Sequence, residues 1–231
     1  MEGEFIMTPV QETLFSMQDL KYKEFQCALI PNIDKDRIIG VRTPALRKYA
    51  KDFVKTEEGL AFINTLPHKY YEENNLHAYM IEYLAKDYET AISLTETFLP
   101  FIDNWAACDT FSPKAFKKDL TAFYDKTLEW IKSSHPYTVR FGIVNQMRWF
   151  LDDRFQEFML NEIASVKSSE YYVNMAIAWY FSIALIRQKD AALPFFTEHR
   201  LDKWIHRKAL QKAIESTRTT KEEKDMYRSL K

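Results

Sequence analysis

Arg42-Thr-Pro-Ala-Leu-Arg-Lys-Tyr-Ala-Lys-Asp-Phe-Val54 is the stretch that decides the fold class of this chain. Its Thr43-Pro44 pair predicts a helix start, because a capping hydroxyl followed by proline suits the first turn of a helix. One apolar stripe then repeats at helical spacing and comprises Leu46, Tyr49, Ala50, Phe53 and Val54. The stretch therefore predicts an amphipathic helix with one buried face.

Helical periodicity continues along the rest of the chain. Residues 72–85 carry a second stripe, made of Leu76, Tyr79, Met80, Tyr83 and Leu84. Further helices are expected over residues 9–17, 19–29, 88–98, 112–133, 136–150, 155–163, 170–187, 191–198, 202–216 and 221–230. Short polar turns join them, so we expect an all-α fold: an α-solenoid of antiparallel helix pairs, with HEAT-like or ARM-type repeats and a concave face. An irregular helical bundle is the alternative.

Composition supports this fold class and excludes several others. The chain of 231 residues is of a size for a single helical-repeat domain over residues 1–231. Its only glycines, Gly3, Gly40, Gly59 and Gly142, are too scattered for a dinucleotide-binding or P-loop motif. No apolar run is long enough for a membrane span, and the acidic N-terminus lacks a signal-peptide pattern. We therefore expect a cytoplasmic protein that acts as a monomer, without a membrane partner.

Charge is distributed unevenly along the chain, although its formal net value is only −1. Residues 1–115 contain 12 Lys/Arg and 18 Asp/Glu, whereas residues 116–231 contain 20 and 15. The basic half could face a polyanion, but an imbalance of this size also arises by chance.

Few residues are arranged for metal or nucleophilic chemistry. The two cysteines, Cys27 and Cys108, are too few for a disulfide framework or a Cys-rich metal site. The five histidines have no metal-ligand spacing, so we expect surface or capping roles for them and no metal or organic cofactor. Cys108 is expected to be a small buried residue. The Glu72-Glu73 pair is expected at a solvated helix start.

Polar side chains within apolar stretches are the better candidates for a site. Trp105 and Asp109 are four residues apart, so on a helix they share one face, and an indole beside a carboxylate suits a cationic ring. A core Trp105, with Asp109 capping the next helix, is the alternative. Arg140 interrupts an apolar stripe and could clamp a phosphate. Trp179 follows small residues and is expected in the core, and it lies 39 residues after Arg140, near the period of HEAT-type repeats.

Taken together, these residues resemble the AlkD-like DNA alkylation repair family, the HEAT-like-repeat alkylpurine DNA glycosylases. The resemblance covers most of the chain. Its first segment is Ile39-Gly-Val-Arg-Thr-Pro-Ala-Leu-Arg-Lys-Tyr-Ala-Lys51. Trp105-x-x-x-Asp109, Arg140 and Trp179 follow in order, and Arg207-Lys-Ala-Leu-Gln-Lys-Ala213 is similar to a terminal repeat.

The resemblance implies hydrolysis of the N-glycosidic bond of a cationic alkylated purine, such as 3-methyladenine or 7-methylguanine, in double-stranded DNA. It implies that Asp109 stabilises the oxocarbenium-like sugar and places a water molecule. Trp105 and Trp179 would contact the deoxyribose of the lesion, and Arg140 would hold the neighbouring phosphate, with Arg148 as its rival. It also implies an enzyme that works without the base-flipping pocket usual for glycosylases.

The net acidic charge departs from the basic DNA-binding face that the resemblance implies. A basic lining could come from Lys114, Lys117, Lys118, Arg207, Lys208 and Lys212, together with Arg218, or these could be ordinary solvated helix faces. Two other functions therefore remain open: a non-catalytic helical-repeat protein that binds DNA or another partner, and a protein-interaction scaffold.

Overall fold

The computed structural model describes residues 7–231. In this part of the chain all regular elements are helices, apart from an isolated β-bridge between Gln18 and Val41. The chain divides into two compact units, with the boundary between Leu120 and Thr121. The single helical-repeat domain expected over residues 1–231 remains a prediction. No helix in the described range is long and apolar enough to cross a membrane.

The first unit is built around α5 (Tyr71–Leu84), which packs against α3 (Thr43–Phe53), α6 (Tyr88–Phe98) and the short helix α7 (Trp105–Asp109). Its other elements are α1 (Pro9–Ser16), α2 (Leu20–Leu29), η1 (Lys35–Arg37), α4 (Glu57–Phe62), η2 (Leu99–Phe101) and η3 (Lys114–Lys118). The stripe predicted for α3 is largely confirmed, since Leu46, Ala50 and Phe53 are buried. The first eleven residues of α5 are buried on every side, not on one stripe.

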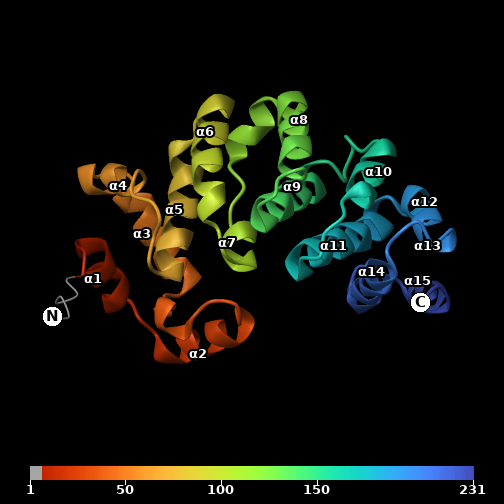
Figure 1. Cartoon of the computed structure of the whole chain (residues 1–231), viewed down its shortest axis with the longest axis horizontal. Helices are drawn as coiled ribbons and strands as arrows, with labels where there is room; N and C mark the ends of the chain where they lie inside the picture. The colour runs from red at the N-terminus through yellow and green to blue at the C-terminus, as the bar shows by residue number, and fades with distance from the viewer. Residues whose placement is uncertain (1–6) are drawn as a thin grey trace. The chain divides into compact units, whose positions relative to one another are not determined.

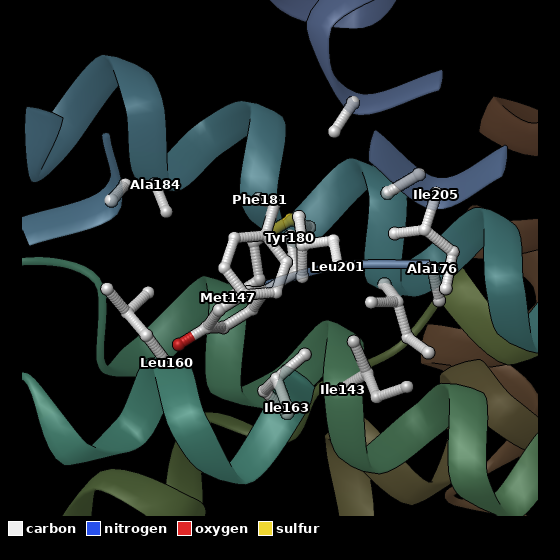
Figure 2. Packing of buried hydrophobic residues seen from close by; sticks show 14 of the residues in the cluster. Ile143, Met147, Leu160, Ile163, Ala176, Tyr180, Phe181, Ala184, Leu201 and Ile205 are labelled. Atoms are coloured by element: carbon white, nitrogen blue, oxygen red, sulfur yellow. The ribbon is translucent and has the colours of Figure 1, made fainter. Parts of the chain in front are cut away.

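The second unit is built around α11 (Tyr171–Arg187), which packs between α9 (Pro136–Trp149) and α14 (Lys203–Glu215). It also contains α8 (Leu120–Trp130), α10 (Phe158–Ser165), α12 (Lys189–Ala192), α13 (Pro194–Thr197) and α15 (Lys221–Ser229). Side chains from all three central helices interdigitate in one apolar core, shown in Figure 2 by Ile143 of α9, Tyr180 and Phe181 of α11, and Ile205 of α14. Gly142 permits the close approach of α9 to Ile131, which a Cβ would reach at 2.9 Å.

Within each unit the main packing contacts join helices close in the chain, α3 to α5 and α5 to α6 in the first and α9 to α11 and α11 to α14 in the second (Figure 1). This confirms the predicted all-α fold of packed helices, as in an α-solenoid. Most helix boundaries agree with the periodicity to within a few residues, and α6 agrees fully. The helix predicted over residues 112–133 is wrong in its first part. Residues 114–118 form a 3-10 helix, and the non-helical backbone of Asp119 (φ −143°, ψ 85°) separates it from α8.

Three further differences are local. Thr43 is the first residue of α3 and not its cap, since Arg42 occupies the N-cap position without a side-chain bond. The segment predicted as one helix over 191–198 is two four-residue helices, α12 and α13, with Pro194 starting the second. The sequence pattern also missed the short helices α4 and α7.

Candidate functional site

Trp105 and Asp109 are the first and last residues of α7, in the first unit. The helix has only five residues, so its own hydrogen bonds hold it weakly. Its N-terminus is capped by Asn104, whose Oδ1 accepts a bond from the backbone N–H of Ala107 at 2.8 Å. The indole N–H of Trp105 donates to the carbonyl oxygen of Leu29, at the end of α2, at 3.2 Å. The predicted one-turn spacing of the half-buried Trp105 and Asp109 is therefore present in a helix that other elements anchor.

The other end of α7 is fixed at Thr110, directly after Asp109. Arg47 of α3 donates from Nη2 to the carbonyl oxygen of Thr110 at 3.0 Å. The hydroxyl groups of Thr110 and Tyr79 are hydrogen-bonded at 2.9 Å. The guanidinium of Arg47 also lies 3.9 Å from the centroid of the Tyr79 ring. Residues from α3 and α5 thus determine where the chain leaves the helix that carries Asp109.

Glu82 completes this arrangement. Its Oε2 accepts a bond from Nη1 of Arg47 at 2.8 Å, and its Oε1 accepts one from the backbone N–H of Ser112 at 3.0 Å. Partial burial lowers the pKa of Arg47, but the hydrogen bond and charge of Glu82 outweigh this effect, so the pKa is raised overall. We refer to Arg47, Tyr79, Glu82 and Thr110 as the α7 clamp. The sequence pattern assigned no role to Arg47, although its position three residues before buried Ala50 places it at the edge of the apolar stripe.

The expectation of a solvated Glu72-Glu73 pair is wrong, because both residues are buried. Glu72 accepts bonds from the backbone N–H groups of Ile39, Gly40 and Val41, at 2.8, 2.6 and 3.3 Å. Burial raises the pKa of Glu72, and these backbone donors oppose the rise. Glu73 accepts bonds from the backbone N–H groups of residues 69 and 70 and from the amide of Gln11. Glu72 therefore holds the segment before α3, and Glu73 holds the start of α5 and a side chain of α1.

Histidines in the first unit also differ from the expectation of surface or capping roles. His68 and His77 are buried and hydrogen-bonded to each other, with Nε2 and Nδ1 at 2.9 Å. Phe62 stacks on His68, and Phe98 stacks on His77. In the second unit, His206 is buried too, whereas His135 caps α9 as expected. No group of three or more His, Cys, Asp or Glu residues within the described chain could hold a metal ion.

Arg140 lies on α9 in the second unit and is only 4% exposed. Its Nη1 donates to the carbonyl oxygen of Tyr172, in the first turn of α11, at 2.8 Å. A contact of Arg140 with a DNA phosphate remains a prediction. The rival, Arg148, is exposed near the end of α9.

Arg140 of α9 and Lys208 of α14 lie close enough to Lys212 of α14 for their charges to act on it. Burial lowers the pKa of Lys212, the charge of Glu215 opposes this fall, and the charges of Lys208 and Arg140 add to it. The three cations are thus near enough to repel one another, with Glu215 as the opposing charge. We refer to Arg140, Lys208 and Lys212 as the cationic cluster. An anion such as a phosphate would relieve the repulsion among them.

The remaining predicted site residues are placed as follows. Trp179 is half-buried on α11 and packs against the core of the second unit, as its small neighbours suggested. Cys108 is fully buried, as expected. Lys114, Lys117 and Lys118 are exposed on η3, and Arg207 is exposed on α14. The structure thus brings Trp105 together with Asp109 in one unit, and Arg140 together with Lys208 and Lys212 in the other.

The all-α fold of packed helices is that of an α-solenoid protein, and α7 is held in place within it. The chain belongs to the DNA alkylation repair enzyme family, because the profile of that family matches residues 10–214. The match includes α7, the cationic cluster and Trp179. No curated protein matches the sequence.

Proposed function

We propose that the protein is a DNA glycosylase that hydrolyses the N-glycosidic bond of cationic alkylated purines in duplex DNA. The observation that carries this proposal is the fixed position of Asp109 at the end of α7. Asn104 caps one end of this helix, and Arg47 and Tyr79 hold the residue that follows its other end. A carboxylate that is fixed before the reaction stabilises developing positive charge without the cost of reorganising its surroundings.

The chemistry needs little more than such a carboxylate. An alkylated purine already carries a positive charge, so it leaves as a neutral base and needs little help from a general acid. As the bond breaks, positive charge moves to the sugar, and a nearby carboxylate both stabilises that charge and orients the attacking water molecule. In this proposal Asp109 takes both roles, and the indole of Trp105, one helical turn away, contacts the deoxyribose.

DNA is the partner that the family indicates, and the second unit offers groups suited to a polyanion. The cationic cluster brings three positive charges from α9 and α14 near each other, with Glu215 as the opposing carboxylate. Phosphate contacts of this kind supply much of the affinity of proteins for DNA. We propose that Arg140 binds the phosphate beside the lesion, and that Trp179 contacts the lesion sugar.

The test is release of free base from methylated duplex DNA, measured by chromatography for the wild type and for Asp109→Asn. We expect the wild type to release 3-methyladenine or 7-methylguanine, and we expect Asp109→Asn to lose about 100-fold or more in rate. Asp52→Asn is the matched control, since it changes an exposed carboxylate of the same unit that pairs with Lys55. Equal release by the wild type and Asp109→Asn would contradict the role of Asp109.

A second candidate function is DNA binding without hydrolysis. The observation that favours it is the group of exposed cations in the second unit, Lys203, Arg207 and Lys231, which can bind phosphates without any hydrolysis. In that case no base is released, while binding to duplex DNA weakens as salt is raised from low to physiological concentration.

A further inference from the structure

The second unit exposes two large aromatic side chains beside each other, Tyr171 at the start of α11 and Trp204 at the start of α14. Tyr171 is 55% exposed and Trp204 is 39% exposed. Their ring centroids are 5.7 Å apart, with the planes at 67°. An edge-to-face pair covers a face of only one ring, so the pair itself leaves other ring faces uncovered. These aromatic rings contribute to the surface and not to the core described above.

Cations surround this pair. Trp204 lines a groove of about 500 Å³, together with Lys203, Arg207, Lys208 and Lys231. Asp202 contributes a carboxylate to the lining, and this carboxylate already accepts a bond from the backbone N–H of Trp204. The ammonium of Lys208 lies 5.8 Å from the centre of the Trp204 ring. We refer to Tyr171, Trp204, Arg207 and Lys208 as the aromatic ledge.

The aromatic ledge is joined to the cationic cluster. Lys208 belongs to both groups. The ring centroids of Tyr171 and Tyr172 are 5.2 Å apart. The carbonyl oxygen of Tyr172 accepts the hydrogen bond from Arg140. A row of rings next to a row of cations is the arrangement with which proteins bind strands of nucleic acid that have unstacked bases.

We propose that the aromatic ledge binds an unpaired nucleobase of a DNA strand, which stacks on Trp204 and Tyr171 while Arg207 and Lys208 pair with the flanking phosphates. The base must be unpaired, because the faces of paired bases are covered by their neighbours within the duplex. The volume of the groove falls in the range of small-ligand sites. This inference rests on the proposed function only in taking DNA as the partner, and it assigns no role in bond cleavage to the aromatic ledge.

The test compares the binding of two fluorescently labelled DNA molecules by anisotropy, a fully paired duplex and the same duplex with one bulged nucleotide. We expect the wild type to bind the bulged DNA about ten-fold more tightly, and Trp204→Ala to lose that preference. Trp204→Phe retains an aromatic face and should keep most of the preference for bulged DNA. Arg207→Gln with Lys208→Gln should weaken binding to both DNA molecules alike, because phosphates are common to them.

Phe158→Ala is the matched control, since Phe158 is 51% exposed on α10 of the same unit and does not line the groove. It should leave the preference for bulged DNA unchanged. Tyr171→Ala provides a second variant should Trp204→Ala fail to fold. An unchanged preference in both alanine variants, or no preference in the wild type, would overturn the proposal. A second result would also overturn the proposal. In that result, binding to anionic phospholipid vesicles depends on Trp204, while the preference for bulged DNA does not.

The two proposals fail separately. If the protein releases base from methylated duplex DNA but shows no preference for bulged DNA, the glycosylase proposal is supported and the proposal for the aromatic ledge is contradicted. Conversely, if the preference for bulged DNA depends on Trp204 but no base is released, the glycosylase proposal is contradicted and the proposal for the aromatic ledge is supported.

Discussion

At the scale of single residues, Arg47 connects α3 and α5 to the chain that leaves α7. Its two terminal nitrogens bond to Glu82 and to the carbonyl oxygen of Thr110, and it contacts the ring of Tyr79. It lies outside the predicted reaction centre, so we assign it as a positioning residue for Asp109.

Arg47→Met should therefore lower the rate of base release by about 10- to 100-fold, with little change in KM, because a small displacement of a reacting group has this effect. Single-turnover excision measured over a range of substrate concentrations separates the two parameters. Arg47→Lys, which keeps the charge but not the two-point contact, should recover only part of the rate. Lys55→Met, at an exposed ion pair of the same unit, is the control. A full wild-type rate in Arg47→Met would remove its positioning role.

The buried pair of His68 and His77 makes stability depend on pH. Burial lowers the pKa of His68 to about 4 and, together with the charge of His68, lowers the pKa of His77 well below its usual range. In the unfolded chain the pKa of each imidazole is about 6.5. The unfolded state therefore binds protons between pH 6.5 and 4 that the native state does not bind. The contribution of the pair is complete above pH 6.5 and is lost as the pH falls toward 4.

We expect the free energy of unfolding to fall by roughly 3 kcal/mol over this range from His68 alone. Urea unfolding at a series of pH values measures the slope. The double variant His68→Gln with His77→Gln should flatten this slope. The control variant His199→Asn should not change the slope; asparagine suits this exposed position because the backbone φ there is +52°. A steep slope that persists in the double variant would show that other groups cause it.

At the scale of the elements, the loop before α3 depends on one glycine. Gly40 has a φ of +97°, and a Cβ there would lie 2.6 Å from Cβ of Lys23 and 2.8 Å from the carbonyl oxygen of Asp19. The loop is also held by Glu72 and by the bond from the backbone N–H of Asp19 to the carbonyl oxygen of Gly40, at 2.9 Å. Loop and glycine together set the start of the helix that carries Arg47.

Gly40→Ala should cost about 3 kcal/mol, because it adds backbone strain to steric overlap. Thermal unfolding of the full chain measures the loss. Lys48→Ala, an exposed substitution on α3, should change stability by less than about 0.5 kcal/mol. If the glycine variant unfolds at the wild-type temperature, the tight approach of α2 to this loop is wrong.

The elements also show what the sequence can and cannot predict. Long amphipathic helices such as α3 and α6 follow from periodicity and start signals, and their predicted boundaries agree well with the structure. α7 was missed because five residues carry no periodicity, and distant residues stabilise it. The burial of Glu72 could not be predicted, because a carboxylate at a helix start is usually exposed and its partners lie more than 30 residues away in sequence. The exposure of Trp204 could not be predicted either, because a single aromatic residue gives no indication of it.

At the scale of the whole molecule, the two units carry opposite net charge. Residues 1–120 contain 14 Lys/Arg and 19 Asp/Glu, and residues 121–231 contain 18 and 14. The modest net charge of the chain therefore conceals a basic unit that contains the cationic cluster. We expect the affinity for DNA to come mainly from that unit.

The affinity for duplex DNA falls as salt rises, and log affinity against log salt concentration gives a slope. The double variant Lys208→Gln with Lys212→Gln should reduce the size of this slope by about 2, because each lost phosphate contact lowers it by nearly one. Anisotropy titrations at several salt concentrations give the slope. Lys221→Gln with Arg228→Gln removes the same charge from α15 and should change the slope far less. Equal slopes for the two double variants would mean that net charge, and not the cationic cluster, governs binding.

The dependence of α7 on distant residues has a consequence for the order in which the first unit assembles. Leu29, Arg47, Tyr79 and Glu82 lie between 30 and 76 residues before the residues they hold in and after this helix. Such non-local contacts form late, after the long helices have docked, and they open first when the protein is stressed. The backbone amides of α7 should exchange with solvent sooner than those of α5, and Asp109 should lose its position well before the long helices unfold.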